Sequence, residues 1–179
     1  AVSALERPTA QLPLREKVVQ EVIRIILEAI YDSPGNPYFD DFSHGFRNGR
    51  GTHTALKEIR KWHGTCWFIQ GTIKGCYDAI DHHKLIEFMT QKIADERFLN
   101  LIRKALNSGC LGTKGAKNIL SGTPQGSIIS PVLANIYLHE LDHFVKKLSK
   151  DYNKEFKVKP ELKKITNCAR IIYTVEKDR

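Results

Sequence analysis

The longest regular pattern of apolar positions runs from Leu14 to Tyr31. Apolar side chains recur there every three or four residues, at Leu14, Val18, Val22, Ile25 and Ala29. A second row, Val19, Ile23, Ile26 and Ile30, widens this stripe. The spacing predicts a helix that is buried on most sides. Pro34, Gly35 and Pro37 end it and open a loop that runs to Arg50.

The patterns that follow predict a second, more polar helix and then a strand. The helix covers Thr52 to His63, and the strand is the aromatic and β-branched run from Cys66 to Ile73. Two further helices are predicted at about His82 to Ile93 and Asp95 to Leu106. Asp81 and Asp95 are placed to cap them.

The second half of the chain alternates loop and helix signals. The glycine-rich stretch from Gly109 to Gly122 is typical of a hairpin or loop, and it leads into a long helix that starts near Ile129. Beyond Lys150 the chain becomes rich in lysine and loses its periodicity, although Ala169 to Val175 is compatible with one more strand.

Charge and cysteine content narrow the function classes. The chain has 28 Lys and Arg against 20 Asp and Glu, a net charge of +8. This favours a polyanionic partner such as RNA, although a merely basic protein remains the alternative. The four cysteines form no Cys-x-x-Cys pair, which indicates a reduced compartment. The sequence also predicts no membrane partner, because no apolar run approaches the length of a span.

Four ordered blocks carry the main functional signal. They are Arg7-Pro8 with Leu14 to Glu21, Phe42 to Gly51 with His53 to Leu56, Trp67 to His83, and the turn and helix from Ser121 to Leu138. Together they resemble group II intron reverse transcriptases, the maturases, and organellar ones most closely. The resemblance implies an α/β fold with reverse-transcriptase-type fingers and an incomplete palm, helix-rich with a small antiparallel sheet. The expected segments are 1–64 (fingers), 65–150 (partial palm) and 151–179 (Lys-rich).

The resemblance also implies a catalytic centre, from which this sequence departs. In the family, carboxylates on a palm strand and on a later hairpin hold two divalent metals. Thr72 occupies the position of the first carboxylate, five residues before the aromatic Tyr77 that screens the sugar 2'-hydroxyl, and no Tyr/Phe-x-Asp-Asp run precedes Arg179. Asp78 and Asp81 lie past the strand, where capping is expected. The resulting expectation is no catalytic residue, no Mg²⁺ site, no other cofactor or metal, and no enzyme activity.

The binding surface, in contrast, is expected to remain. By resemblance, Tyr77, Pro124, Gln125 and Gly126 face the nucleotide and template, while Ser127 replaces a usual glycine. Basic residues form the candidate RNA-binding set: Arg7, Arg15, Lys17, Arg47, Arg50, Lys146, Lys147 and Lys150. Arg47 and Arg50 rank first, because the glycines around them give the loop room for a phosphate. The alternative for each is a solvated surface charge.

A competing motif lies in the last helix. His139-Glu140-Leu141-Asp142-His143 satisfies His-Glu-x-x-His, which on a helix is the pattern of a zinc metalloprotease. The alternative places both imidazoles on the rim of an amphipathic helix.

These observations lead to one function hypothesis with a second held open. The chain is interpreted as an RNA-binding remnant of a maturase without polymerase activity. It is expected in a mitochondrial or other organellar ribonucleoprotein, either an intron complex or a ribosome, with structured RNA and other proteins as partners. The alternative is one fragment of a split maturase that is active only in complex.

Overall fold

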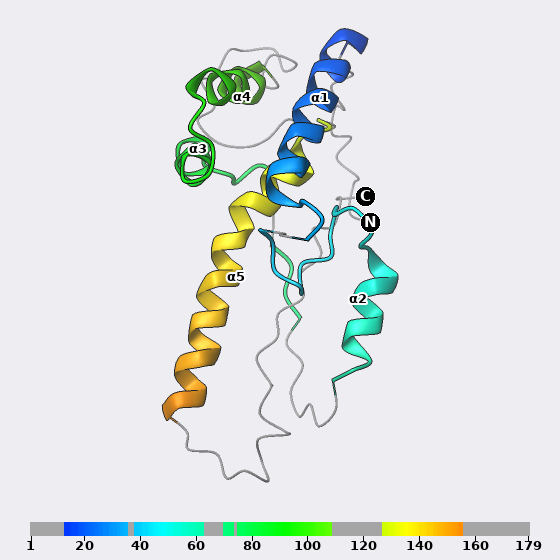
Figure 1. The fold of residues 1–179 in the computed structure, drawn as a ribbon, viewed down its shortest axis with the longest axis vertical. Coiled ribbons are helices and arrows are strands. Elements are labelled where there is room, and N and C mark those ends of the chain that lie inside the picture. Colours follow the sequence, from blue (N-terminus) through cyan, green and yellow to red (C-terminus); the bar gives the residue numbers. More distant parts are fainter. Residues whose placement is uncertain (1–12, 36–37, 63–69, 74, 109–126, 156–179) are drawn as a thin grey trace, which may run out of the picture. The chain divides into compact units, whose positions relative to one another are not determined.

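The computed structural model describes residues 13–35, 38–62, 70–73, 75–108 and 127–155. Within these ranges the regular structure is helical (Figure 1): α1 Leu14–Tyr31, α2 Thr52–Ile59, α3 His82–Thr90, α4 Glu96–Ser108 and α5 Ser130–Glu155. None of these helices combines the length and apolar character needed to cross a membrane. The helix bounds confirm all five predicted helices, with α2 and α3 ending about a turn earlier than expected.

The described residues fall into two compact units that are interleaved in sequence. The first unit comprises residues 13–27, 75–108 and 127–134, and the second comprises 28–35, 38–62, 70–73 and 135–155. The segments predicted from the sequence are instead consecutive. The difference arises because α1 and α5 each begin in the first unit and end in the second.

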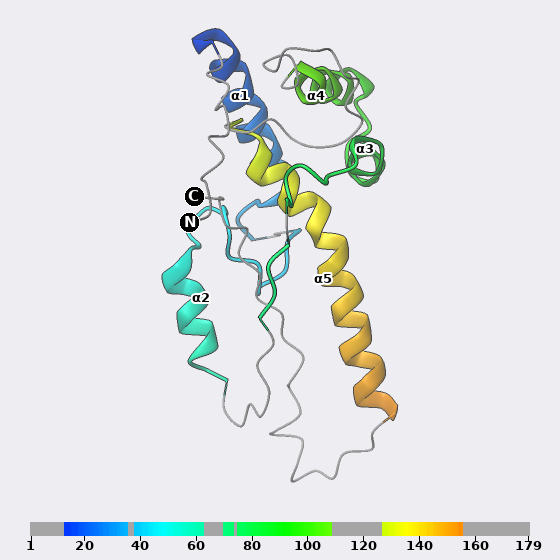
Figure 2. The ribbon, with the colours of Figure 1, turned by 180° about the vertical axis from the view of Figure 1, so that it is seen from behind.

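The first unit is built around the pairing of α3 with α4, which lie side by side in Figures 1 and 2. Their apolar faces supply five of the fully buried side chains: Leu85, Met89, Leu99, Ile102 and Leu106. Both predicted caps are present. Asp81 accepts a hydrogen bond from the Lys84 backbone N–H at 3.0 Å, and Asp95 accepts one from that of Arg97 at 2.8 Å.

A buried polar contact links α1 to the segment that enters α5, within the same unit. The Gln20 side-chain carbonyl accepts hydrogen bonds from the Ser127 hydroxyl and the Ile128 backbone N–H, both at 3.0 Å. Gln20 is 4% and Ser127 7% exposed, so the contact is shielded from water. The Ser127 side chain, which stands where the resembling family has glycine, therefore has a structural role.

Helix α1 is buried on one face, which corrects the expectation that it is buried on most sides. Ile23, Leu27 and Tyr31 are almost fully buried at spacings of four. The stripe that first identified the helix lies opposite and is exposed: Leu14 79%, Val18 56%, Val22 51% and Ile25 54%. The spacing predicted the helix correctly, but a chain apolar on two faces does not reveal which face packs.

The predicted sheet is not found in the described part of the chain. Residues 70–73, the end of the expected strand, form no strand, and Gly71, Thr72 and Ile73 are exposed. For this portion the predicted core strand is not confirmed, because a core strand would bury these side chains. Residues 66–69, the glycine-rich stretch 109–122 and the possible strand 169–175 lie outside the described residues.

Candidate nucleic-acid interface

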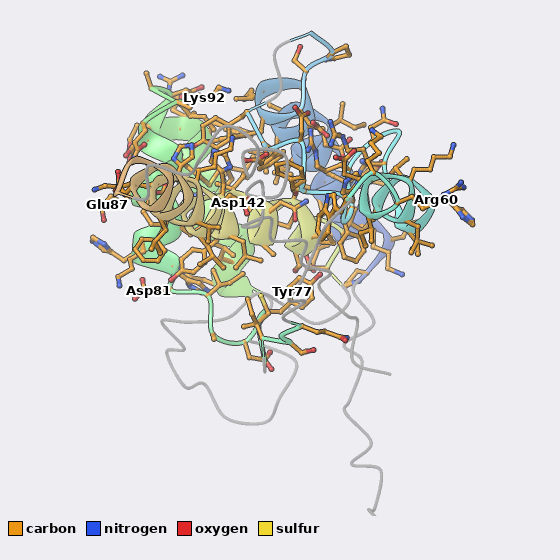
Figure 3. All side chains as sticks on the ribbon, turned by 90° about the horizontal axis from the view of Figure 1, so that it is seen from below. Arg60, Tyr77, Asp81, Glu87, Lys92 and Asp142 are labelled. Atoms are coloured by element: carbon orange, nitrogen blue, oxygen red, sulfur yellow. The ribbon has the colours of Figure 1, made fainter. Side chains whose placement is uncertain are left out.

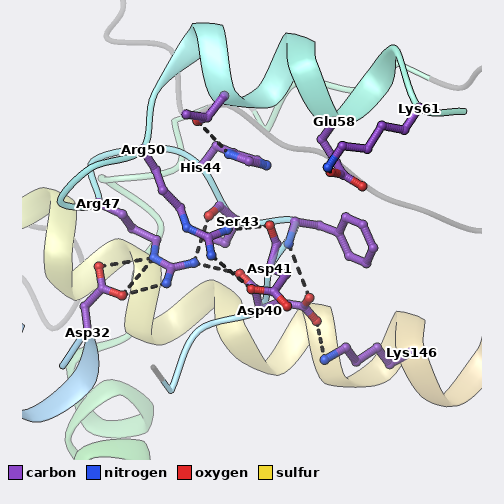
Figure 4. A network of polar contacts seen from close by, with 12 residues as sticks. Asp32, Asp40, Asp41, Ser43, His44, Arg47, Arg50, Glu58, Lys61 and Lys146 are labelled. Carbon is purple, nitrogen blue, oxygen red and sulfur yellow. Dashed lines mark hydrogen bonds and ion pairs between the residues drawn. The ribbon is translucent and has the colours of Figure 1, made fainter. Parts of the chain in front are cut away.

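The loop formed by residues 38–51 in the second unit, named the Arg47 loop, is organised by a buried guanidinium (Figure 4). Arg47 forms an ion pair with Asp32, with Nη2 2.6 Å from Oδ1, and its Nε also donates to that carboxylate. Nη1 donates to the backbone carbonyls of Asp40, at 2.7 Å, and Ser43, at 2.9 Å. The Arg47 side chain is only 3% exposed, and its guanidinium lies 5.4 Å from the Phe39 ring centroid.

These contacts revise the predicted role of Arg47. A buried guanidinium is stable only when its donors are paired, and here a carboxylate and two carbonyls pair them. A phosphate would have to displace these partners and open the loop. Arg47 therefore stabilises the loop, and its buried, paired guanidinium does not support the RNA contact that was predicted for it.

Arg50 occupies the accessible side of the same loop. It donates to the Asp41 backbone carbonyl at 2.5 Å and to the Asp41 carboxylate at 2.9 Å. The Arg50 side chain is 25% exposed and that of Asp41 84%. An exposed ion pair of this kind contributes little and exchanges readily for another anion. Phosphate binding by Arg50 thus stays a prediction with which its exposure is compatible.

Two buried or half-buried groups connect the Arg47 loop to α5. Lys146 Nζ lies 2.5 Å from the Asp40 carboxylate, whose side chain is 5% exposed. Burial raises the pKa of Asp40, but the hydrogen bonds from Lys146 and from the Phe42 backbone N–H outweigh it and bring the pKa below its usual value. Asn135, 2% exposed, donates its amide to the Gly45 carbonyl at 2.8 Å.

The tautomer of His44 follows from its hydrogen bonds. Its Nδ1 lies 2.9 Å from the Thr54 hydroxyl, which also lies 2.7 Å from the Gly51 carbonyl. A hydroxyl has one proton, and the Gly51 carbonyl can only accept it, so Nδ1–H must donate to Thr54. Burial first, then Arg50 and Arg47, lower the pKa of His44. His44 thus ties the Arg47 loop to the first turn of α2.

Helix α2 adds basic residues that the sequence analysis did not select. Lys57 lies in the last turn of α2, and Arg60 and Lys61 follow directly after the helix; all three are exposed and are named the α2 basic face. Figure 3 shows Arg60 pointing outward from α2. Lys61 pairs with Glu58 at 2.7 Å. The spacing of these cations in the sequence could have indicated a shared basic face. They lie in and just after the helix that follows Arg50.

The other predicted site residues are divided among several places. Arg15 and Lys17 are exposed on α1 in the first unit, and Lys147 is exposed on α5 in the second. Tyr77 is half-buried (Figure 3), and burial, with a smaller effect of Cys76, raises the pKa of its phenol to about 12. The predicted residues Arg7, Pro124, Gln125 and Gly126 lie outside the described residues, as does the side chain of Lys150.

The two histidines of the competing motif differ in environment. His139 is 2% exposed, with its ring centroid 4.2 Å from that of Tyr38 and 4.3 Å from that of His143. Burial, and then His143, lower the pKa of His139 to about 4, so it is neutral at pH 7. The rim position expected for His139 is wrong, because the ring fills the core beside Tyr38, whereas His143 is exposed. No cluster of three or more His, Cys, Asp or Glu in the described ranges could hold a metal ion.

Comparison with known proteins adds an independent line of evidence. Residues 4–159 match the family described as reverse transcriptase (RNA-dependent DNA polymerase). The chain is 46% identical over 175 residues to the group II intron-encoded protein LtrA of Lactococcus lactis, covering 96% of this chain and 28% of that protein. It is 50% identical over 149 residues to an uncharacterized 91 kDa protein in a cob intron of Schizosaccharomyces pombe, covering 83% and 18%.

A plant relative extends the comparison. The chain is 34% identical over 129 residues to nuclear intron maturase 4, mitochondrial, of Arabidopsis thaliana, covering 71% of this chain and 16% of that protein. The chain thus spans less than a third of the length of each of these relatives.

These matches correct one prediction. Thr72 and the missing carboxylate hairpin led to the expectation that the chain is not an enzyme. The family match and LtrA point instead to a family of enzymes. Thr72 and the absence of the hairpin from this stretch were too narrow a basis for denying an activity to the chain.

Proposed function

Because the chain belongs to the reverse transcriptase (RNA-dependent DNA polymerase) family and is similar to group II intron-encoded proteins, we propose that it binds intron RNA. The proposed RNA-binding surface consists of Arg50 and the α2 basic face. A maturase binds the structured RNA of its intron, and phosphate contacts supply most of the affinity for such a partner. The proposed role is a component of an intron ribonucleoprotein.

The position of Arg50 is the observation that carries this proposal. The buried Arg47–Asp32 ion pair and the Asn135 contact hold the loop, while Arg50 is left on its accessible side. A cation presented on a rigid loop loses little conformational freedom when it binds a phosphate. The net charge of +8 adds a long-range attraction for a polyanion.

The setting proposed for this activity is the mitochondrion. The names of two relatives, a mitochondrial protein of Marchantia polymorpha and the Arabidopsis intron maturase, support it. Partner proteins of the same ribonucleoprotein are part of the proposal.

The salt dependence of RNA binding tests the proposal. Arg50→Gln should weaken binding of a group II intron RNA several-fold at moderate salt. It should also reduce the slope of log K against log salt by about one unit, because one phosphate contact is lost. Binding is measured by filter retention across a salt series.

Arg103→Gln provides the matched control. Arg103 is an exposed arginine of α4, in the first unit, and its ion pair with Glu96 resembles that of Arg50 with Asp41. This variant removes the same charge from a different surface, so its affinity and salt slope should stay close to those of the unmodified chain. Equal losses in the two variants would show that only net charge matters and would contradict the proposed surface.

A further inference from the structure

Phe46 is an exposed aromatic residue in an unfavourable backbone conformation. Its φ is 53°, and no other non-glycine residue among those described has a positive φ. A large side chain is rarely found in this left-handed region, because its Cβ crowds the backbone. The ring is also 48% exposed, so packing does not offset the cost. Such outliers persist where the surroundings fix them, and they cluster at ligand sites.

The residues on both sides of Phe46 fix this conformation. The carbonyl of Gly45 accepts the buried amide of Asn135 at 2.8 Å. On the other side, Arg47 is held by Asp32 and by the carbonyls of Asp40 and Ser43. With both neighbours anchored, the backbone of Phe46 has little freedom to relax. The fold therefore holds the ring on the surface of the Arg47 loop.

The residues that follow Phe46 in the Arg47 loop are polar or cationic. Asn48 is exposed, and Arg50 lies four residues after Phe46 in the chain. Four residues span at most about 14 Å, so the two side chains are within reach of one short stretch of nucleic acid. Proteins that bind single-stranded nucleic acids commonly combine an aromatic ring with a nearby cation. The bases stack on the ring, and the phosphates pair with the cation.

We propose that Phe46 stacks on an unpaired base of the bound RNA while Arg50 holds a phosphate of the same strand. This inference rests on the proposed RNA-binding function and adds a preference for single-stranded segments. An apolar protein segment packing on the ring is the competing occupant. Asn48 and Arg50, which follow Phe46 within four residues, favour RNA over such a segment.

The test compares two probes of equal charge. One is a single-stranded oligoribonucleotide, and the other is the same ribose-phosphate chain with its bases removed. The full chain should bind the base-bearing probe more tightly. Phe46→Leu keeps an apolar side chain without an aromatic face, so it should weaken binding of that probe about tenfold. It should leave binding of the abasic probe unchanged, whereas Phe46→Tyr should bind both probes as the unmodified chain does.

Two further variants test whether the effect is specific to position 46 and whether the ring only stabilises the fold. Phe144→Leu makes the same substitution at a 59% exposed position of α5 and should change neither affinity. Phe46→Asn suits the left-handed backbone, so it should unfold close to the temperature of the unmodified chain and still lose the preference for bases. A large drop in its unfolding temperature would show that the ring packs within the fold, which would overturn the inference.

The outcomes separate this inference from the proposed function. If the unmodified chain binds neither probe nor intron RNA, the proposed function fails and the stacking role falls with it. If it binds both probes and Phe46→Leu alters neither affinity, RNA binding stands and the stacking role is wrong. An equal loss for both probes would likewise exclude base stacking.

Discussion

At the scale of single residues, charge type alone did not distinguish a partly exposed arginine from a buried, structural one. Arg47 and Arg50 were indistinguishable in the sequence, since both lie in the same glycine-containing loop. The structure separates them through Asp32, a partner 15 residues away from Arg47. Phe46 was not selected at all, because a positive φ on a non-glycine residue has no sequence signal. The capping roles of Asp81 and Asp95 were predictable, since a cap depends only on local spacing.

His139 should make stability depend on pH. Its pKa is about 6.5 in the unfolded chain and about 4 in the folded one. Between these values the unfolded chain takes up a proton that the folded chain does not. The free energy of unfolding therefore falls as the pH drops from above 6.5 to 4, by roughly 3 kcal/mol at most. Above pH 6.5 this contribution is fully present.

The substitution His139→Phe checks this assignment. A phenyl ring can fill the space beside Tyr38 but cannot take up a proton. Urea unfolding of the two proteins between pH 4 and pH 8 should give curves that differ in slope below pH 6.5 and run parallel above it. Curves that run parallel across the whole range would show that His139 does not titrate in this way.

At the scale of elements, helices were predictable and their packing was not. The stripe from Leu14 to Ile25 located α1 correctly, yet it is the opposite row, Ile23 and Leu27, that is buried. A helix forms from local hydrogen bonds and spacing, whereas the buried face depends on residues far along the chain, such as Ser127 against Gln20. The expected strand at Cys66–Ile73 depended on distant partners in the same way.

The Arg47 loop gives a prediction about stability. Arg47→Met removes the guanidinium and leaves the Asp32 carboxylate, only 10% exposed, without its cation. Breaking a buried pair in this way should lower the free energy of unfolding by about 3 to 5 kcal/mol. Arg50→Met removes an exposed pair in the same loop and should cost less than about 1 kcal/mol. Urea unfolding measures both.

A second substitution distinguishes the ion pair from simple loss of bulk. Adding Asp32→Asn to Arg47→Met removes the unpaired buried charge, so part of the lost stability should return. If the double variant is less stable than Arg47→Met alone, or if the Arg47 and Arg50 variants lose equal stability, the loop is held by other contacts.

At the scale of the whole molecule, the family was recognisable from the sequence. Several blocks in a fixed order identified the reverse transcriptase relationship that the comparisons show. The interleaving of two units could not be predicted, because it depends on which ends of α1 and α5 pack with which loops. The prediction about enzyme activity failed for a related reason: it judged an activity from one stretch of a longer family pattern.

The central claim is that intron RNA binds the second unit across the Arg47 loop and the α2 basic face. Photo-crosslinking of the chain to a group II intron RNA, followed by identification of the attached peptides, tests it most directly. The account predicts crosslinks within residues 38–61 that disappear with an excess of unlabelled intron RNA. Crosslinks confined to α4 or to Lys146 and Lys147 of α5, with residues 38–61 unlabelled, would contradict it.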